Sequence, residues 1–369
     1  MPSIFEKFSK HKKFKDEIIP PTREFEFIST GILNLNLLFS GKVFGGVMKG
    51  SMTMMSAPSQ LGKSFVGMNV LKNAQKAGME CMILHTEKNF DFKWAEKIGI
   101  DTAPDKLLVF EISNLTSLKQ IVQEAVEGKS RKERENLFIL IDSWGSIVTT
   151  VQQKKAGEGS ETKDMSEAYW KNGFANIIKD TDVTAFILNH VYDNVGGFGD
   201  PLEIPGGKRL YFNSQSVVLG SSVAKDRETD NSISGDIITA RTHKGRGVYR
   251  YTTLKYRIKQ SGGLDLFYGL LPDALEAGVV EKPKNGKYSR PCIEDDKEWK
   301  EKQIYCKDFW LPVFKETDFA EWLEDKYTPK NQDLDISGDD ITIMIQKDGV
   351  NVTQVVSKEE AGIVDEDED

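Results

Sequence analysis

The sequence predicts an α/β fold in which a mostly parallel central sheet carries an N-terminal arm and a small helix-rich C-terminal domain. From residue 51 onward, short apolar runs alternate with helical patterns, which is typical of parallel strands covered on both faces. A polar, Gly-containing loop joins the first of these strands to its helix. After residue 269 the pattern changes to two helix-rich stretches, which predict a separate small domain.

The expected elements follow one another along the chain. A short strand at 25–28 precedes the core. We expect strands at 51–57, 81–86, 106–112, 137–142 and 183–190, and helices at 63–78, 92–98, 115–126 and 165–180. Apolar runs at 216–222, 236–243 and 250–258 have no long helix between them, so the sheet should end in antiparallel strands.

This pattern divides the 369 residues into four parts. We expect an N-terminal oligomerisation arm at 1–28, the core at 29–268, a small C-terminal domain at 269–335, and a variable segment with an acidic tail at 336–369. Two long loops, near 149–165 and 191–214, interrupt the core. Both follow strands at the sheet edge where α/β folds place their ligands, and loops of this length are usually functional.

Composition limits the class of protein. The chain is 39% hydrophobic and 29% charged, with no apolar run of membrane-spanning length. Its N-terminus lacks the continuous apolar stretch of a secretory signal. Cys81, Cys292 and Cys306 lack metal-ligand spacing, which favours free thiols in a reducing compartment. We therefore expect a cytoplasmic protein with no membrane partner.

The negative charge is concentrated at the C-terminus. The last eleven residues carry seven carboxylates, so the rest of the chain is near −1 (−8 plus 7). A solvated, disordered tail is the favoured interpretation of such a run. The alternative is a tail that competes with nucleic-acid phosphates for a basic surface elsewhere on the protein.

The first motif with a chemical interpretation is APSQLGKS, between an expected strand and an expected helix. Its members are Ala57, Pro58, Ser59, Gln60, Leu61, Gly62, Lys63 and Ser64. Backbone N–H groups at such a loop bind phosphate oxygens. Lys63 would reach the β- and γ-phosphates of ATP, and Ser64 would bind Mg²⁺ through its hydroxyl. Ala57 replaces the glycine of the strict pattern, which is possible if its φ is negative.

Two carboxylates follow buried strands. Asp142 ends LFILID, where an acidic group is unfavourable unless it binds a metal or donors, so we favour a Mg²⁺ role over a helix cap. Glu87 follows CMILHT and could activate the water that attacks the γ-phosphate. By spacing alone, a cap or a surface charge explains Glu87 equally well.

Polar residues at two further strand ends are also candidate site residues. Asn189 and His190 end VTAFILNH and could sense the γ-phosphate, although a capping pair or a satisfied core histidine fits the pattern too. Lys244 and Arg246, in THKGR, could act as cationic fingers on a neighbouring subunit's ATP. On pattern alone, exposed basic side chains at a turn are the commoner outcome.

These motifs resemble those of the RecA recombinases, and most closely the UvsX-type branch found in tailed phages. The resemblance covers roughly residues 25–325 and is carried by ISTGILNLNLLFSG, CMILHTE, LFILIDS, ILNH and GLLPDALEAGVVEKPKNGKYSR. It implies a RecA-like P-loop NTPase core. It also supports Glu87 as the water activator, and implies that Trp94 stacks on adenine while Asp91 contacts the adenine amino group. An aspartate common in the family two residues before the glutamate is His85 here.

The resemblance further assigns the two long loops to DNA. It implies that basic and aromatic side chains in them neutralise phosphates and stack on bases, namely Lys154, Lys155, Phe198, Lys208, Arg209, Tyr211 and Phe212. The implied function is ATP-dependent strand exchange in recombination, repair and replication. Its partners would be single- and double-stranded DNA, further copies in a helical filament, a single-strand binding protein and a loading mediator.

Two alternatives remain at this point. One is a replicative ring helicase on the same core, although such a protein normally has a partner-binding domain before the core, and about 25 residues leave no room for one. The other is a non-catalytic filament or loading factor with a decayed site. The presence of Lys63, Ser64, Glu87 and Asp142 argues against decay.

Overall fold

The computed structural model describes the core and the C-terminal domain. The described residues are 24–87, 90–147, 167–193, 202–205, 208–228, 232–260, 263–294, 297–329, 340–347 and 350–357, with Ile4 and Phe8 before them. The expected arm, the first long loop and the acidic tail thus lie largely or wholly outside the described residues. Among the helices described, none is long and apolar enough to cross a membrane.

A nine-stranded sheet forms the centre of the molecule, in the order β13-β12-β11-β10-β3-β7-β6-β4-β5. Its strands are β3 (Met52–Ser56), β4 (Glu80–His85), β5 (Leu107–Glu111), β6 (Leu137–Asp142), β7 (Thr184–Asn189), β10 (Ser216–Arg227), β11 (Ile233–Lys244), β12 (Thr253–Lys259) and β13 (Gly263–Leu264). Pairings from β10 to β5 are parallel, and those from β10 to β13 are antiparallel. The predicted mostly parallel sheet with antiparallel strands at one end is therefore confirmed.

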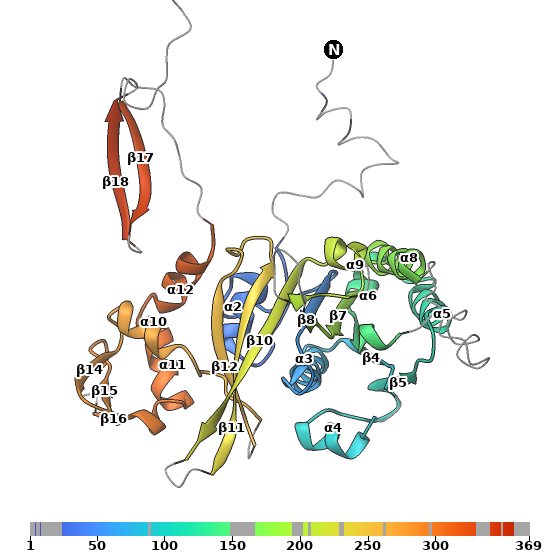
Figure 1. The fold of residues 1–369 in the computed structure, drawn as a ribbon, viewed down its shortest axis with the longest axis horizontal. Helices are drawn as coiled ribbons and strands as arrows, with labels where there is room; N and C mark the ends of the chain where they lie inside the picture. Colours follow the sequence, from blue (N-terminus) through green and yellow to red (C-terminus); the bar gives the residue numbers. More distant parts are fainter. Residues whose placement is uncertain are drawn as a thin grey trace, which may run out of the picture.

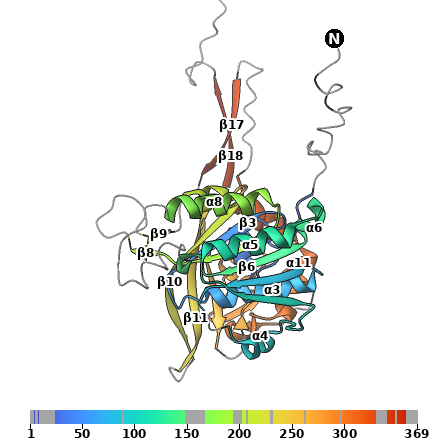
Figure 2. The same cartoon turned by 90° about the vertical axis from the view of Figure 1, so that its right-hand side faces the viewer.

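Helices cover both faces of the sheet because its central strands are apolar on both sides. One face packs against α2 (Leu33–Ser40), α3 (Lys63–Lys76) and the C-terminal helices. The other packs against α5 (Leu115–Val126), α8 (Glu167–Asp180) and α9 (Lys208–Asn213). Figure 2 shows α8 and α5 on one side of the strands, with α3 and α4 (Phe92–Ile98) on the other.

The C-terminal domain lies beside the antiparallel end of the sheet (Figure 1). Its elements are α10 (Leu271–Glu276), β14 (Glu281–Lys284), β15 (Lys287–Ser289), β16 (Trp299–Lys300), η3 (Glu301–Gln303), α11 (Lys307–Glu316) and α12 (Phe319–Tyr327). Arg257 of β12 lies against the stacked rings of Tyr268 and Tyr305, 4.6 and 4.5 Å from their centroids, and donates to Asp265 at 2.6 Å. This stacked cation joins the domain to the sheet.

Several elements differ from the expectation. β10 and β11 extend as a hairpin beyond the predicted runs at 216–222 and 236–243. The helices α2 and α6 (Arg131–Glu135) were not predicted, nor were the pairs β1 (Phe27–Ile28) with β2 (Val47–Met48) and β8 (Tyr192–Asp193) with β9 (Leu202–Glu203). The small three-stranded sheet of the C-terminal domain was also missed. A last hairpin, β17 (Asp340–Lys347) and β18 (Val350–Ser357), stands apart from the domain in Figure 1.

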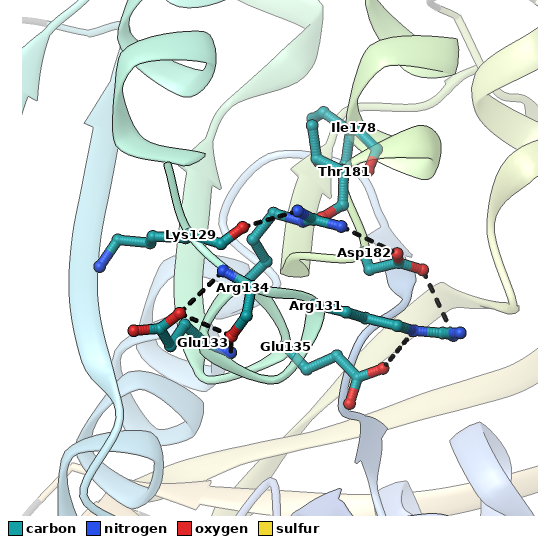
Figure 3. Close-up of polar contacts among 9 residues, drawn as sticks. Lys129, Arg131, Glu133, Arg134, Glu135, Ile178, Thr181 and Asp182 are labelled. Carbon is teal, nitrogen blue, oxygen red and sulfur yellow. Dashed lines mark hydrogen bonds and ion pairs between the residues drawn. The ribbon is translucent and has the colours of Figure 1, made fainter. Parts of the chain in front are cut away.

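A network of polar groups ties the elements together at the amino ends of the central strands (Figure 3). Arg134 of α6 donates to the carbonyls of Lys129 and Thr181, both at 2.8 Å. Its other nitrogen lies 3.6 Å from the Asp182 carboxylate, and Arg131 lies 3.5 Å from the same group. The two arginines and Asp182 therefore hold α6 against the turn that precedes β7.

Thr184, the first residue of β7, adds a second link at this amino end. Its hydroxyl accepts the N–H of Gly50 at 2.9 Å and donates to the carbonyl of Glu135 at 2.7 Å. The side chain is 0% exposed, so both main-chain groups depend on it rather than on water.

Candidate functional site

The candidate residues lie at the carboxyl ends of four strands that are direct neighbours in the sheet. β3 leads into the 57–64 loop, β7 ends beside His190, β6 ends at Asp142, and β4 ends just before Glu87. Residues far apart in the sequence are thereby brought to one sheet edge, which is where open α/β sheets bind ligands.

The 57–64 loop has the geometry of a phosphate-binding loop. It follows β3 directly, and α3 begins at Lys63 behind Gly62, which has φ +72°. The first N–H groups of α3 therefore point out of the helix start, where the helix dipole favours an anion. The ammonium of Lys63 donates to the carbonyls of Ala57 and Pro58, both at 2.8 Å, and so folds over the loop.

Ala57 is accommodated by a glycine on the next strand. Among the described non-glycine residues, φ is positive only at Gln60, Asp182 and Tyr251, so Ala57 has the negative φ that it requires. Its methyl group faces Gly220 of β10, where an added Cβ would lie 2.9 Å from that of Ala57. Alanine can therefore replace the usual glycine at position 57 because position 220 also carries a small residue. Gln60, with φ +64°, holds a backbone conformation that L residues seldom adopt.

Asp142 is half-buried at the end of β6, beside the 57–64 loop and the tip of β4. Burial raises its pKa, while a hydrogen bond from Ser64 lowers it and the Glu87 carboxylate raises it. Burial likewise lowers the pKa of Lys63, against the attraction of Asp142 and Glu87. The turn η2 (Trp144–Ser146) has Ser143 at its N-cap, with no side-chain cap bond. Helix capping therefore does not explain Asp142.

Glu87 and His190 face each other from neighbouring parts of the site. His190 Nε2 lies 3.8 Å from Glu87 Oε1, and the two side chains are 24% and 43% exposed. Glu87 also lines a cavity of about 200 Å³ with Ser64 and Asp142. The cavity thus joins the candidate water activator to both candidate metal ligands.

Trp94 and Asp91 border the same cavity. Trp94 lies on α4, with its ring 6.2 Å from that of Phe65 in a tilted arrangement. Asp91 is the N-cap of α4, and its carboxylate accepts the N–H of Trp94 at 3.1 Å. The Asp91 carboxylate, which is expected to contact adenine, therefore also caps the helix that carries Trp94.

The tip of β7 is connected to the second long loop. Asn189, which is completely buried, donates from its side-chain amide to the carbonyl of Pro205 at 2.8 Å. The backbone carbonyl of Asn189 accepts the N–H of Ala57 at 3.2 Å. One residue therefore contacts both the 57–64 loop and the segment 191–214.

The helix α9 presents the described part of the candidate DNA-binding residues. Lys208 and Arg209 are exposed, Tyr211 is half-buried, and Phe212 is 62% exposed. The helix is anchored to α8 because the Arg209 N–H donates to Asn172 at 2.9 Å. Lys154, Lys155 and Phe198 lie outside the described residues.

Lys244 has an intramolecular role that the sequence did not indicate. Its ammonium donates to the carbonyls of Tyr211, Phe212 and Ser214, at 3.0, 2.7 and 2.7 Å, and so caps the C-terminal end of α9. Burial lowers its pKa, as does the nearby charge of Arg246, which is exposed. The two expected fingers therefore differ: Arg246 projects outward, while Lys244 binds the end of a helix in its own subunit.

The donors at this sheet edge fit a nucleotide with Mg²⁺. Across the described ranges, no three His, Cys, Asp or Glu side chains cluster as a metal cage would require. One hydroxyl and one carboxylate, from Ser64 and Asp142, instead line the same cavity beside a phosphate-binding loop. Mg²⁺ in nucleotide sites is typically held by so few protein ligands, with phosphates and water completing its shell.

Two families match this sequence. The RecA N-terminal domain matches residues 7–264, and the C-terminal domain of the bacteriophage T4 recombination and repair protein matches residues 267–323. The recombination and repair protein of Enterobacteria phage T4 is 24% identical over 318 residues, which span 82% of this chain and 79% of that protein. Protein RecA of Thermus aquaticus is 26% identical over 267 residues, or 71% and 75% of the two chains. A solved structure of the RadB recombinase is 15% identical, with a TM-score of 0.46 over 64% of this chain and 98% of that one.

Proposed function

Because this chain belongs to the RecA family, we propose that it is an ATP-dependent DNA strand-exchange recombinase. It acts in homologous recombination and in the repair and replication that depend on it, in the cytoplasm of a phage-infected host cell. The similarity to the phage T4 recombination and repair protein, together with the match of its C-terminal domain, supports this assignment over other P-loop proteins.

The observation that carries the proposal is the meeting of candidate groups at the ends of four neighbouring parallel strands. Ser64, Glu87 and Asp142 line one cavity, with Lys63 folded over the loop beside it and His190 3.8 Å from Glu87. Buried charges that lack full internal pairing are typical of sites that bind charged ligands.

In the proposed reaction, the N–H groups at the start of α3 and the ammonium of Lys63 bind the ATP phosphates. Ser64 and Asp142 would hold Mg²⁺, and the bound ion would neutralise charge on the phosphates. Glu87 orients the attacking water and accepts its proton at a carboxylate oxygen. His190 contacts the γ-phosphate, and Asn189 links that strand end to the DNA-binding loop through Pro205.

DNA binds along the filament axis through the two long loops. Lys208 and Arg209 neutralise phosphates, and Phe212 stacks on bases, with Lys154, Lys155, Phe198 and Tyr211 adding to the surface. Arg246 and Lys244 reach the ATP of the next subunit, so hydrolysis depends on assembly. Lys244 must then exchange its three carbonyl acceptors at the end of α9, on Tyr211, Phe212 and Ser214, for the phosphates.

The decisive experiment is strand exchange between a labelled single strand and a homologous duplex in the presence of ATP and Mg²⁺. We expect displacement of the identical strand from the homologous duplex and none from a heterologous duplex of equal length. Failure to exchange strands by a preparation that hydrolyses ATP and coats DNA would exclude the recombinase assignment.

A second measurement tests the ATPase directly. Turnover should rise when single-stranded DNA is added, because assembly on DNA completes each site with groups from the neighbouring subunit. Equal rates with and without DNA would contradict the proposal. Electron microscopy of the DNA complex should show helical filaments, whereas closed rings would favour a helicase.

A further inference from the structure

Two side chains at the tip of β4 bind main-chain groups next to the candidate catalytic residues. The ladder between β4 and β6 ends with the pair His85 and Asp142. Thr86 continues the connection one residue further, because its N–H donates to the carbonyl of Asp142 at 2.9 Å. Its hydroxyl accepts the N–H of Ser143 at 2.9 Å and donates to the carbonyl of Ser143 at 3.0 Å.

His85 fixes the next part of the same turn. Its Nδ1 accepts the N–H of Glu87 at 3.1 Å, which requires that Nδ1 is unprotonated and that Nε2 carries the ring proton. The side chain is only 7% exposed and its ring meets Phe90 edge-to-face at 5.6 Å, so the imidazole is held in place. Asp and Asn often close a turn in this way, by accepting the N–H two residues further along.

The bonds of His85 and Thr86 act on the two carboxylates that the reaction needs. Thr86 fixes the backbone on both sides of the Asp142–Ser143 peptide, and His85 fixes the backbone of Glu87. Glu87 lies beyond the last ladder pair, and its side chain is 43% exposed. Its backbone position therefore depends on the turn rather than on the sheet.

We propose that His85 and Thr86 are positioning residues for ATP hydrolysis, which set the distance between the Glu87 and Asp142 carboxylates. The inference rests on the proposed function of this site as an ATPase. A ring nitrogen of His85 then accepts the N–H two residues further along, as an aspartate or asparagine side chain does in many turns.

The test for Thr86 uses a replacement of equal shape. Thr86→Val removes the hydroxyl and should lower kcat on the order of 100-fold, since a shift of about 1 Å in a catalytic group can have that effect. KM for ATP should stay close to the wild-type value, because the loop at 57–64 is untouched. Thr86→Ser keeps the hydroxyl and should restore most of the turnover.

Thr184 provides a matched control at the other end of the sheet. Its hydroxyl also accepts one backbone N–H and donates to one carbonyl, at 2.9 and 2.7 Å. Thr184→Val should lower the free energy of unfolding yet leave kcat of the folded protein unchanged. If Thr86 only stabilises the fold, Thr86→Val will likewise lower the free energy of unfolding and leave kcat unchanged.

The test for His85 compares His85→Asn with His85→Leu. Asparagine can accept the Glu87 N–H and should keep kcat near the wild-type value, while leucine fills similar space without an acceptor and should lower kcat as Thr86→Val does. This pair gives an independent answer if one Thr86 variant does not fold, which equilibrium urea unfolding will show.

The outcomes separate the inference from the proposed function. If the wild-type protein shows no ATPase with single-stranded DNA, the proposed function fails. If the wild type is active and both Thr86→Val and His85→Leu keep the wild-type kcat, the function stands and the positioning role is overturned. A lowered kcat that Thr86→Ser and His85→Asn restore, with KM unchanged, supports it.

Discussion

The two ends of the central sheet use polar residues in opposite ways. At the amino ends of the strands, Arg134 and Thr184 bind main-chain carbonyls and N–H groups, and Asp182 receives two arginines. At the carboxyl ends, Lys63 is buried and Asp142 half-buried, and desolvation shifts both pKa values toward the neutral forms. The first arrangement pairs its polar groups with one another, whereas in the second, burial disfavours the charged forms of Lys63 and Asp142.

This difference separates stability from function along the same strands. Changes at the amino end should alter the free energy of unfolding without altering the chemistry. Changes at the carboxyl end should remove activity while leaving stability the same or higher, as is common where a binding site is less stable than the fold requires.

The largest expected effect is that of Lys63→Ala on turnover. Removal of the phosphate-binding charge should lower DNA-stimulated ATPase activity by roughly 100-fold or more. The free energy of unfolding should change little, because relief of the burial penalty on the ammonium offsets the loss of its two carbonyl hydrogen bonds. Steady-state kinetics with urea unfolding will check both, and Lys76→Ala, exposed on the same helix, is the control. Normal turnover in Lys63→Ala would remove the assignment of the 57–64 loop.

At the opposite end, Arg134→Ala should affect stability alone. Its guanidinium donates to two carbonyls, so its loss should lower the free energy of unfolding by about 2 kcal/mol. The kcat of the protein that remains folded should equal that of the wild type. Urea unfolding monitored by tryptophan fluorescence is the measurement, with the exposed Lys132→Ala as its control. A specific loss of kcat in Arg134→Ala would contradict the separation of the two ends.

Asp142→Asn should abolish activity and yet stabilise the fold at neutral pH. Burial raises the pKa of Asp142, so the native state disfavours the carboxylate once pH exceeds the usual aspartate value. Asparagine avoids that penalty, and we expect a gain of about 1 kcal/mol near pH 7. The gain should shrink as pH falls, because the wild-type carboxyl is then protonated in both states. A loss of stability at pH 7 would show that the ionised carboxylate is favourable in the fold.

The smallest expected effect is that of Gln60→Gly. Gln60 has φ +64°, which glycine adopts without strain, so the variant should gain a few tenths of a kcal/mol. The greater freedom of glycine in the unfolded chain offsets part of the gain. Differential scanning calorimetry should detect a small rise in Tm. A fall in Tm would indicate that the glutamine side chain makes a stabilising contact of its own.

The central strands could be predicted because continuous apolar runs with sharp ends leave few other interpretations. The outer half of the β10–β11 hairpin could not, since its residues are largely exposed and carry no apolar pattern. The helix α2 escaped detection for the opposite reason. Seven of its eight residues are buried, so it has no polar face to reveal a helical period.

The candidate site followed the same logic. The positions of Lys63, Glu87 and Asp142 at strand and loop ends could be predicted from the sequence, although spacing alone left the role of Glu87 open and only the family resemblance favoured a water activator. The roles of Thr86, His85 and Lys244 depend on main-chain groups elsewhere, such as the Ser143 N–H and the carbonyls ending α9. No local spacing encodes such contacts. These contacts join residues that are far apart in the sequence and lie close together only in the folded sheet.

The contact between Ala57 and Gly220 restricts the order in which substitutions can accumulate in related sequences. With Ala57 present, an alanine at 220 would bring two Cβ atoms to 2.9 Å, between two paired strands that cannot easily separate. With glycine at 57, that barrier disappears. An exchange of the two small residues must therefore pass through glycine at both positions, because alanine at both would bring the two Cβ atoms too close.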